Sequence, residues 1–208
     1  MFIDIANTPD FKRSLFNAIV APRPIGWIST LSVDGTPNLA PFSHFNLVST
    51  APAIVMFSCN TPADRAEKDT LANVRATGEF VTNLATWDLR NPMNHSSINA
   101  PPGVDEFDLC GLDKAPCRFV LPPRVAASPA SMECKLMQII EIKPQGPSDT
   151  YSHVVFGHIV GVHIDDAFID DANRFNVART QPLTRLDGSN YASVGPLVEL
   201  GRPSPRRD

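Results

Sequence analysis

The sequence lacks the markers of disulfide-stabilised and membrane proteins. Only four of its 208 residues are cysteine, and no two of them form a C-x-x-C pair. We therefore expect reduced thiols in a cytoplasmic protein. No apolar stretch approaches the ~20 residues of a membrane-spanning helix, and the N-terminus has no basic segment followed by an apolar one. These absences predict neither a membrane span nor a signal peptide.

The chain also has little charge. Charged residues make up 19% of it, the formal net charge is −4 and the pI is near 5.7. Proteins that bind nucleic acid or an anionic membrane usually present a basic surface. We therefore expect neither of these partners.

Three common catalytic and nucleotide-binding motifs are missing. No G-x-G-x-x-G follows a predicted strand, no G-x-x-x-x-G-K-[ST] occurs, and no serine lies in a G-x-S-x-G elbow. A Rossmann dinucleotide domain and a P-loop are not expected, and nothing in the spacing favours a hydrolase triad.

The histidines and acidic residues form no metal-binding pattern along the chain. His153, His158 and His163 recur every five residues in one predicted strand, so neighbouring members point to opposite faces. His153 and His163 share a face but would lie ~33 Å apart. The acidic residues between 165 and 171 lack the EF-hand spacing. We therefore expect no metal.

Prolines, by contrast, are abundant. Many of the 20 fall between short apolar segments, where they mark strand ends and loops because proline cannot donate to a central ladder. These frequent breaks favour a barrel or sandwich over a βαβ fold. The apolar fraction of 43% is sufficient for a core, and we predict one domain over residues 1–200 with a disordered tail over 201–208.

Alternation, apolar runs and turn signals place the main elements. Helices are predicted between Thr8 and Pro22 and over residues 70–78, the second ending at Gly78. The predicted strands cover residues 25–32, 37–42, 53–59, 79–86, 130–142 and 151–164.

The stretch over residues 21–60 carries more small polar side chains than a core strand needs. Such groups suit a surface that hydrogen-bonds a polar, planar, phosphate-bearing ligand, and they are Ser29, Thr30, Ser43, His44, Asn46, Ser58 and Asn60. Arg23 and Lys68 supply positive charge, and Thr70 adds a hydroxyl and a helix N-terminal amide. The alternative, with Lys68 solvated and Arg23 in an ion pair, stays equally open at this point.

An ordered set of segments resembles the flavin reductase-like domain family, which binds FMN on a split β-barrel. They are PRPIGWIST followed by DG, NLAPFSHFN, VMFSC, KDT, GEFVTNLA, MNHSS, VVFGHIVGVHI and PLTRLDGSNY, and together they span nearly the whole chain. The resemblance implies a mainly β fold with flanking helices, a six-stranded Greek-key split barrel. It also implies a homodimer with FMN near the subunit interface.

The resemblance also implies a position for each part of FMN, although no residue is assigned as catalytic. The isoalloxazine ring would face the loop of Ser43, His44, Phe45 and Asn46. Ser29 and Thr30 would lie along the ribityl chain. The ribityl and phosphate end would contact Ser58, Cys59, Asn60, Arg65, Lys68, Asp69 and Thr70, with Arg23 as a further candidate. Arg185 and Tyr191 would close the site from elsewhere in the dimer.

The resemblance implies an enzyme that transfers a hydride from NAD(P)H to flavin N5 and passes electrons to an acceptor. A protein electron-transfer or monooxygenase partner belongs to this expectation. One alternative is a flavoredoxin-like FMN-binding electron-transfer protein without efficient NAD(P)H turnover. Another is an FMN-dependent oxidase in which His44, His95 or His158 donates a proton. The choice between NADH and NADPH is not visible in the sequence.

Overall fold

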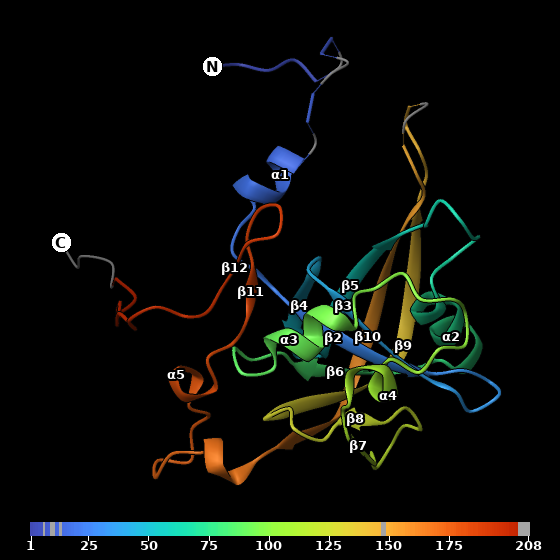
Figure 1. The fold of residues 1–208 in the computed structure, drawn as a ribbon. Coiled ribbons are helices and arrows are strands. Elements are labelled where there is room, and N and C mark those ends of the chain that lie inside the picture. The colour runs from blue at the N-terminus through green and yellow to red at the C-terminus, as the bar shows by residue number, and fades with distance from the viewer. Residues whose placement is uncertain (6, 9–10, 13, 147–148, 204–208) are drawn as a thin grey trace.

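The computed structural model describes residues 1–5, 7–8, 11–12, 14–146 and 149–203. Its main feature is a seven-stranded antiparallel sheet, coloured from blue to orange in Figure 1. The strand order across the sheet is β3 (Pro37–Phe42), β2 (Gly26–Leu31), β6 (Glu79–Leu84), β9 (Ala130–Ile142), β10 (Ser152–Ile164), β5 (Ala53–Asn60) and β4 (Phe45–Thr50).

The two edge strands of this sheet are consecutive in the chain. Only Ser43 and His44 separate β3 from β4, and β3 also contacts β5. A link of two residues spans little distance, so the two edges lie close together and the sheet curves into a barrel.

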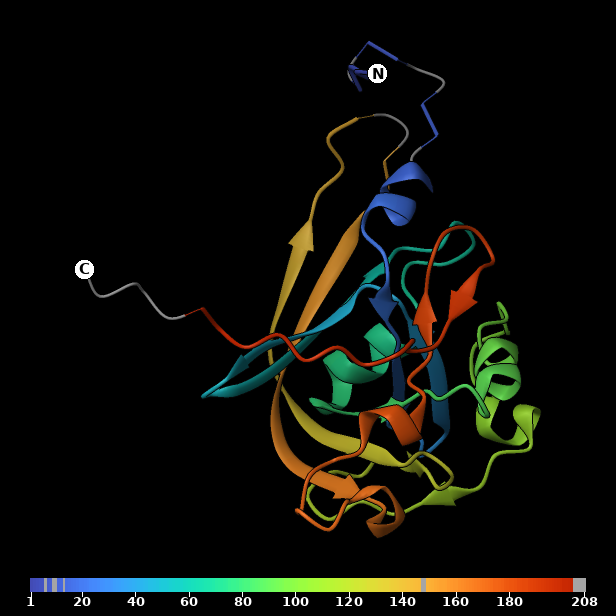
Figure 2. The same cartoon turned by 90° about the vertical axis from the view of Figure 1, so that its left-hand side faces the viewer.

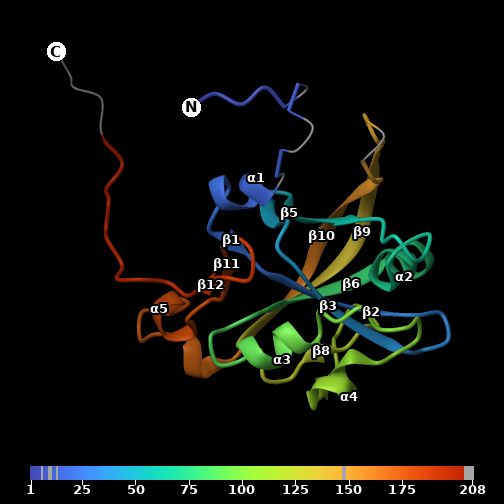
Figure 3. The same ribbon diagram turned by 45° about the horizontal axis from the view of Figure 1, so that its top comes forward.

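Among the described residues, two small sheets and five short α-helices flank the barrel. β1 (Arg23–Pro24) pairs with the hairpin of β11 (Thr184–Arg185) and β12 (Tyr191–Ala192), and β7 (Lys114–Ala115) pairs with β8 (Arg124–Val125). The helices are α1 (Ser14–Ile19), α2 (Asp69–Thr77), α3 (Arg90–His95), α4 (Glu106–Cys110) and α5 (Val177–Thr180), with a 3₁₀ turn over Asp166–Phe168. Figures 1 and 3 both show the β11–β12 hairpin beside α1 and well away from α2.

The barrel interior is packed with aromatic and aliphatic side chains. The Phe57 ring lies 4.9 Å from Phe42 and 5.4 Å from Phe80, centroid to centroid, and both Phe57 and Phe80 are fully buried. Gly157 of β10 leaves the space that Phe80 fills, because a Cβ there would lie 2.3 Å from its ring. A second core beneath α3 and α4 contains Trp27, Leu39, Met93, Phe107 and Leu183.

The structure confirms the predicted mainly β class and corrects the predicted number of strands in the barrel. The main sheet has seven strands rather than six. The strand over residues 45–50 was not predicted because its residues, FNLVST, are mostly exposed and show no apolar alternation. It forms by pairing with β5 at the sheet edge. In the predicted tail, residues 204–208 lie outside the described residues.

Figure 2 shows the long strands β9 and β10 extending together beyond the body of the barrel. Both strands have 13 residues, with register shifts at Phe156/Gly157 and Ile159/Gly161. Such shifts increase the local bend of a strand. Among the described residues, no helix has the length and apolar character needed to cross a membrane.

Candidate functional site

A polar hollow of about 160 Å³ lies beside the first turn of α2. We call it the α2 hollow. Residues of β3, the loop before α2, the segment after α3 and the start of α4 surround it. They are Asn38, Ala40, Pro41, Arg65, Lys68, Asp69, Thr70, Ser96, Ser97, Ile98, Asn99, Ala100 and Glu106. Four of the residues predicted from the sequence, Arg65, Lys68, Asp69 and Thr70, therefore meet here.

The start of α2 favours an anion. Lys68 precedes the helix with extended backbone, and no side chain of the described part caps the first turn. The first amides of a helix carry partial positive charge and need an acceptor. The Lys68 ammonium adds a full charge and lies 5.5 Å above the Phe42 ring. The hollow thus combines the Arg65 and Lys68 cations and a helix start, which favour phosphate, with the Asp69 and Glu106 carboxylates, which oppose it.

Arg65 joins the loop before α2 to the segment after α3. Its Nη1 donates to the Ala100 carbonyl at 3.1 Å and its Nη2 to the Asn99 side chain at 2.6 Å. Nη1 also lies 3.6 Å from the Asp69 carboxylate. The Arg65 Nε is buried with no hydrogen-bond partner in the described part of the chain. The same Nε lies 3.9 Å from the Asp64 carboxylate, so this arginine shapes the wall of the hollow through contacts within the chain.

A buried hydrogen-bond network supports the floor of the hollow. The Asn38 side-chain oxygen accepts from Thr70 at 2.8 Å and from Thr30 at 3.3 Å. The Asn38 amide donates to Glu106 at 2.9 Å, and Asn73 donates to Thr30 at 3.0 Å. Thr30 and Thr70, both predicted site residues, thus belong to one network that holds β2, β3 and α2 in fixed positions.

Glu106 lies at the base of this network with 5% of its surface exposed. Burial raises its pKa, and the hydrogen bonds from the Leu39 amide and the Asn38 side chain oppose that rise. Neutralisation of Glu106 would remove a negative charge from beneath the hollow, which would favour an anion bound above it.

The loop predicted to face a planar ring lies at the junction of β3 and β4. The His44 carbonyl accepts from the Ser58 amide at 2.8 Å, and the pKa of the His44 imidazole is lowered by partial burial and by Arg23. Phe45 packs on Gly26, where a Cβ would lie 2.5 Å from its ring, and it lines an apolar cavity of about 320 Å³. The Asn46 side chain accepts from the Leu47 amide.

The predicted residues at the end of β5 do not line the α2 hollow. Cys59 is buried in the barrel core, and burial raises the pKa of its thiol to about 11. The Asn60 side chain is exposed and accepts from Ser152 at 2.8 Å. Ser58 is half-buried between β4 and β10. The assignment of these three residues to FMN stays a prediction.

Ser29 points away from the α2 hollow. Its hydroxyl donates to the Pro123 carbonyl at 2.6 Å and accepts from Asn83 at 3.2 Å, beneath the β7–β8 segment. Successive residues of a strand face opposite sides, so Ser29 and Thr30 cannot both reach one ligand from the same face. The structure therefore separates these two predicted ribityl contacts.

Arg23 and Arg185 lie in the small sheet formed by β1, β11 and β12. The Arg23 guanidinium is buried and donates to the carbonyls of Asn17, Val20 and Leu186, which ties α1 to the β11–β12 turn. Arg185 lies 4.5 Å from the centre of the Tyr191 ring and donates to the Tyr191 hydroxyl. Their contacts within this chain are structural, and their contact with FMN stays a prediction.

Five polar residues of the α2 hollow were not assigned to the site from the sequence. Ser96 accepts from the Trp27 indole at 2.9 Å and donates to the Met93 carbonyl. In the sequence, the MNHSS segment was connected with the site only through the family resemblance. Asn38 is a single polar residue in β3, and nothing in the sequence around it indicated a role in the site. The five are Asn38, Ser96, Ser97, Asn99 and Glu106.

Comparison with known proteins places this arrangement among flavin proteins. Residues 20–183 match the family described as the flavin reductase like domain. An uncharacterized protein from Aquifex aeolicus is 36% identical over 185 residues, which cover 89% of this chain and 91% of that protein.

Two solved structures with this fold are 26% and 28% identical in sequence to this chain. Nitrilotriacetate monooxygenase component B from Bacillus cereus superposes with a TM-score of 0.87 at 26% identity, covering 96% of this chain and 99% of that one. The 2-nitrobenzoate 2-nitroreductase of Pseudomonas fluorescens has a TM-score of 0.85 at 28% identity, covering 100% and 99%. With the family match over residues 20–183, the chain belongs to the flavin reductase-like domain family.

Proposed function

We propose that this chain is an FMN-binding oxidoreductase that takes a hydride from NAD(P)H and passes electrons to an acceptor. The observation that carries the proposal is the α2 hollow, where the Lys68 ammonium, the Arg65 guanidinium and the start of helix α2 meet. This donor set fits a phosphate dianion, and the family is defined by flavin chemistry.

The residues of the hollow would hold the phosphate end of FMN. Lys68 and the first amides of α2 supply the charge and the donors. Asn38 holds the Thr70 hydroxyl by a 2.8 Å hydrogen bond, so this side chain is fixed before a ligand arrives. FMN, when bound, supplies the hydride and electron transfer through its isoalloxazine ring. The protein's own task is to bind, orient and shield that ring.

The names of the similar proteins support a redox role with a separate acceptor. One is a component of a monooxygenase and the other is a nitroreductase. We therefore extend the proposal to a cytoplasmic protein with residues 1–200 as one FMN-binding domain and an electron acceptor outside this chain.

We propose a homodimer as the working form. Exposed apolar side chains on β4 and β9 provide surface that a second copy would cover, and they are Leu47, Val48, Met137, Ile140 and Ile142.

Substitution of Lys68 tests the phosphate site. We expect Lys68→Ala to weaken FMN binding by about 1.5–3 kcal/mol, the range for a lost hydrogen bond to a charged group. Flavin fluorescence quenching in a titration measures this. Lys143→Ala is the matched control, because Lys143 is exposed and outside the hollow. Equal FMN affinity of both variants would place the phosphate elsewhere.

Steady-state oxidation of NADH and of NADPH with added FMN tests the reaction. Turnover with either nucleotide supports the reductase. If FMN stays with the protein through gel filtration while neither nucleotide is oxidised, the chain is an electron carrier and the reductase proposal fails.

A further inference from the structure

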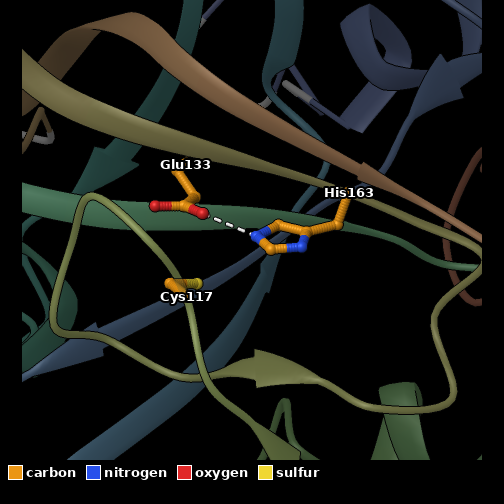
Figure 4. A group of neighbouring side chains, drawn as sticks. All are labelled: Cys117, Glu133 and His163. Atoms are coloured by element: carbon orange, nitrogen blue, oxygen red, sulfur yellow. Dashed lines mark hydrogen bonds and ion pairs between the residues drawn. The ribbon is translucent and has the colours of Figure 1, made fainter.

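Three side chains of types that bind transition metals lie close together in the structure, although they are far apart in the sequence. The Sγ of Cys117, a carboxylate oxygen of Glu133 and a ring nitrogen of His163 all lie within 4.8 Å of each other. Figure 4 shows the three side chains meeting from the β7–β8 loop, β9 and β10. No part of the α2 hollow is formed by these residues. We call them the Cys117 cluster.

The pairing of β9 and β10 brings Glu133 and His163 together. Glu133 lies opposite Gly161, and His163 lies opposite Ser131, so Glu133 and His163 are diagonal neighbours on one face of the sheet. Gly161 has no side chain to fill the space between them, and a Cβ there would lie 3.4 Å from the Glu133 carboxyl group. The His163 Nε2 is consequently 2.5 Å from the Glu133 Oε1.

The Glu133 carboxylate is held in place from outside the cluster. The amides of Arg118, Phe119 and Val120 donate to its two oxygens at 2.6–3.1 Å. Metal-binding carboxylates and imidazoles are typically oriented by such outer hydrogen bonds. The same three amides follow Cys117 directly in the chain, so they hold the backbone next to Cys117 close to the carboxylate.

One side of the Cys117 cluster is open to a cavity of about 540 Å³. Glu133, His163 and Asp165 line it, as do the cationic residues Arg118 and Arg124, whereas Cys117 is not among its lining residues. Three protein ligands with an open fourth position form the usual arrangement of a zinc site that exchanges water. A thiolate, an imidazole and a carboxylate are also the ligand types that zinc binds most often.

We propose that Cys117, Glu133 and His163 form a binding site for Zn²⁺, with the fourth position facing this cavity. One thiolate and one carboxylate together balance the charge of the divalent ion. Binding replaces the thiol proton of Cys117, which leaves to solvent, and His163 binds the ion through a ring-nitrogen lone pair. The ion binds the Glu133 Oε1 in place of the hydrogen bond between His163 and that oxygen. The hydrogen bonds from the backbone amides to Glu133 remain.

Titration of the full chain with Co²⁺, after removal of metal and flavin, tests the site. We expect one Co²⁺ per chain, tetrahedral d–d absorption in the visible and a thiolate-to-cobalt charge-transfer band in the near-UV. Zn²⁺ should displace both signals and should raise the melting temperature of the wild type. Cys117→Ser should abolish the charge-transfer band, and His163→Gln should weaken Co²⁺ binding at least tenfold.

Matched variants separate this site from binding elsewhere. Cys110→Ser and His158→Gln remove a half-buried thiol and an exposed imidazole outside the cluster, and both should bind Co²⁺ as the wild type does. Circular dichroism establishes that the variants are folded. A charge-transfer band that persists in folded Cys117→Ser would overturn the proposal, as would the absence of stoichiometric Co²⁺ binding by the wild type. Neither result depends on FMN or on turnover.

Discussion

Two buried glutamates support two regions of this molecule, and their charge states are driven in opposite directions. Glu106 lies beneath the α2 hollow and Glu133 beneath the β7–β8 loop, with 5% and 1% of their surfaces exposed. Glu106 accepts from one backbone amide and one side chain, and its pKa is raised because burial dominates. Burial also acts on Glu133, but hydrogen bonds from the loop amides and from His163 outweigh it and lower its pKa. Of these two carboxylates, the one with more hydrogen-bond donors is the one whose pKa is lowered.

Removal of the Glu133 carboxylate should have the largest effect. We expect Glu133→Ala to lower the free energy of unfolding by about 3 kcal/mol, because three amides lose a charged acceptor and each loss costs ~1–3 kcal/mol. Urea unfolding measures this. Glu141→Ala on the same strand is the control, since Glu141 is exposed and its removal should cost less than about 1 kcal/mol. Similar values for the two variants would show that the loop does not depend on Glu133.

The contributions of the two glutamates to stability should change in opposite directions with pH. The contribution of Glu133, whose folded pKa is lowered from 4.5, is complete above that pH and is lost as the pH falls through the folded pKa. The folded pKa of Glu106 is raised from 4.5, so Glu106 binds its proton more tightly in the folded state. This proton binding stabilises the fold fully below pH 4.5, and the stabilisation is lost as the pH rises through the folded pKa. The slope for one group is at most ~1.4 kcal/mol per pH unit.

Unfolding of Glu133→Gln and Glu106→Gln between pH 3 and pH 7 measures these contributions. The cost of Glu133→Gln relative to wild type should grow with pH, and that of Glu106→Gln should shrink. Parallel profiles would mean that the donors around the two carboxylates do not distinguish them.

The network above Glu106 should matter for FMN as well as for stability. We expect Asn38→Ala to weaken FMN binding by about 1 kcal/mol, because Thr70 loses the acceptor that fixes its hydroxyl. Asn190→Ala, in the exposed β11–β12 turn, is the control. An unchanged FMN affinity of Asn38→Ala would show that the network supports the fold alone.

The smallest effect on FMN should come from Ser29. Its hydroxyl is bonded to Pro123 and Asn83 on the side away from the α2 hollow. Ser29→Ala should therefore leave FMN affinity unchanged while lowering the free energy of unfolding by ~0.5–1.5 kcal/mol. A loss of FMN affinity comparable to that of Lys68→Ala would restore Ser29 to the site.

Much of the fold was predictable because it depends on local pattern. The strands over Pro37–Phe42 and Ala130–Ile142 were predicted with their observed bounds, and Gly78 ends α2 in the left-handed conformation expected of a helix-terminating glycine. Edge strand β4 was missed because pairing with β5, not burial, specifies it.

The site was less predictable, because hydrogen-bond partners come from distant segments. Lys68 and Thr70 stood out as a cation and a hydroxyl beside a helix start. Asn38 and Glu106 are 68 residues apart and carried no joint signal until the fold placed them 2.9 Å from each other. His163 was considered only together with the other histidines of its strand. Its contact with Glu133 depends on strand register, which spacing along one strand does not contain.

The short link between β3 and β4 limits how this fold can vary. With Ser43 and His44 alone between the two edge strands, their ends can separate by no more than ~11 Å. An insertion at this position would let the two edge strands move apart, and the backbone that β3 and β4 leave unpaired would become more accessible to another chain. The segment predicted to face the flavin ring is thus also the one that limits how far the barrel can open.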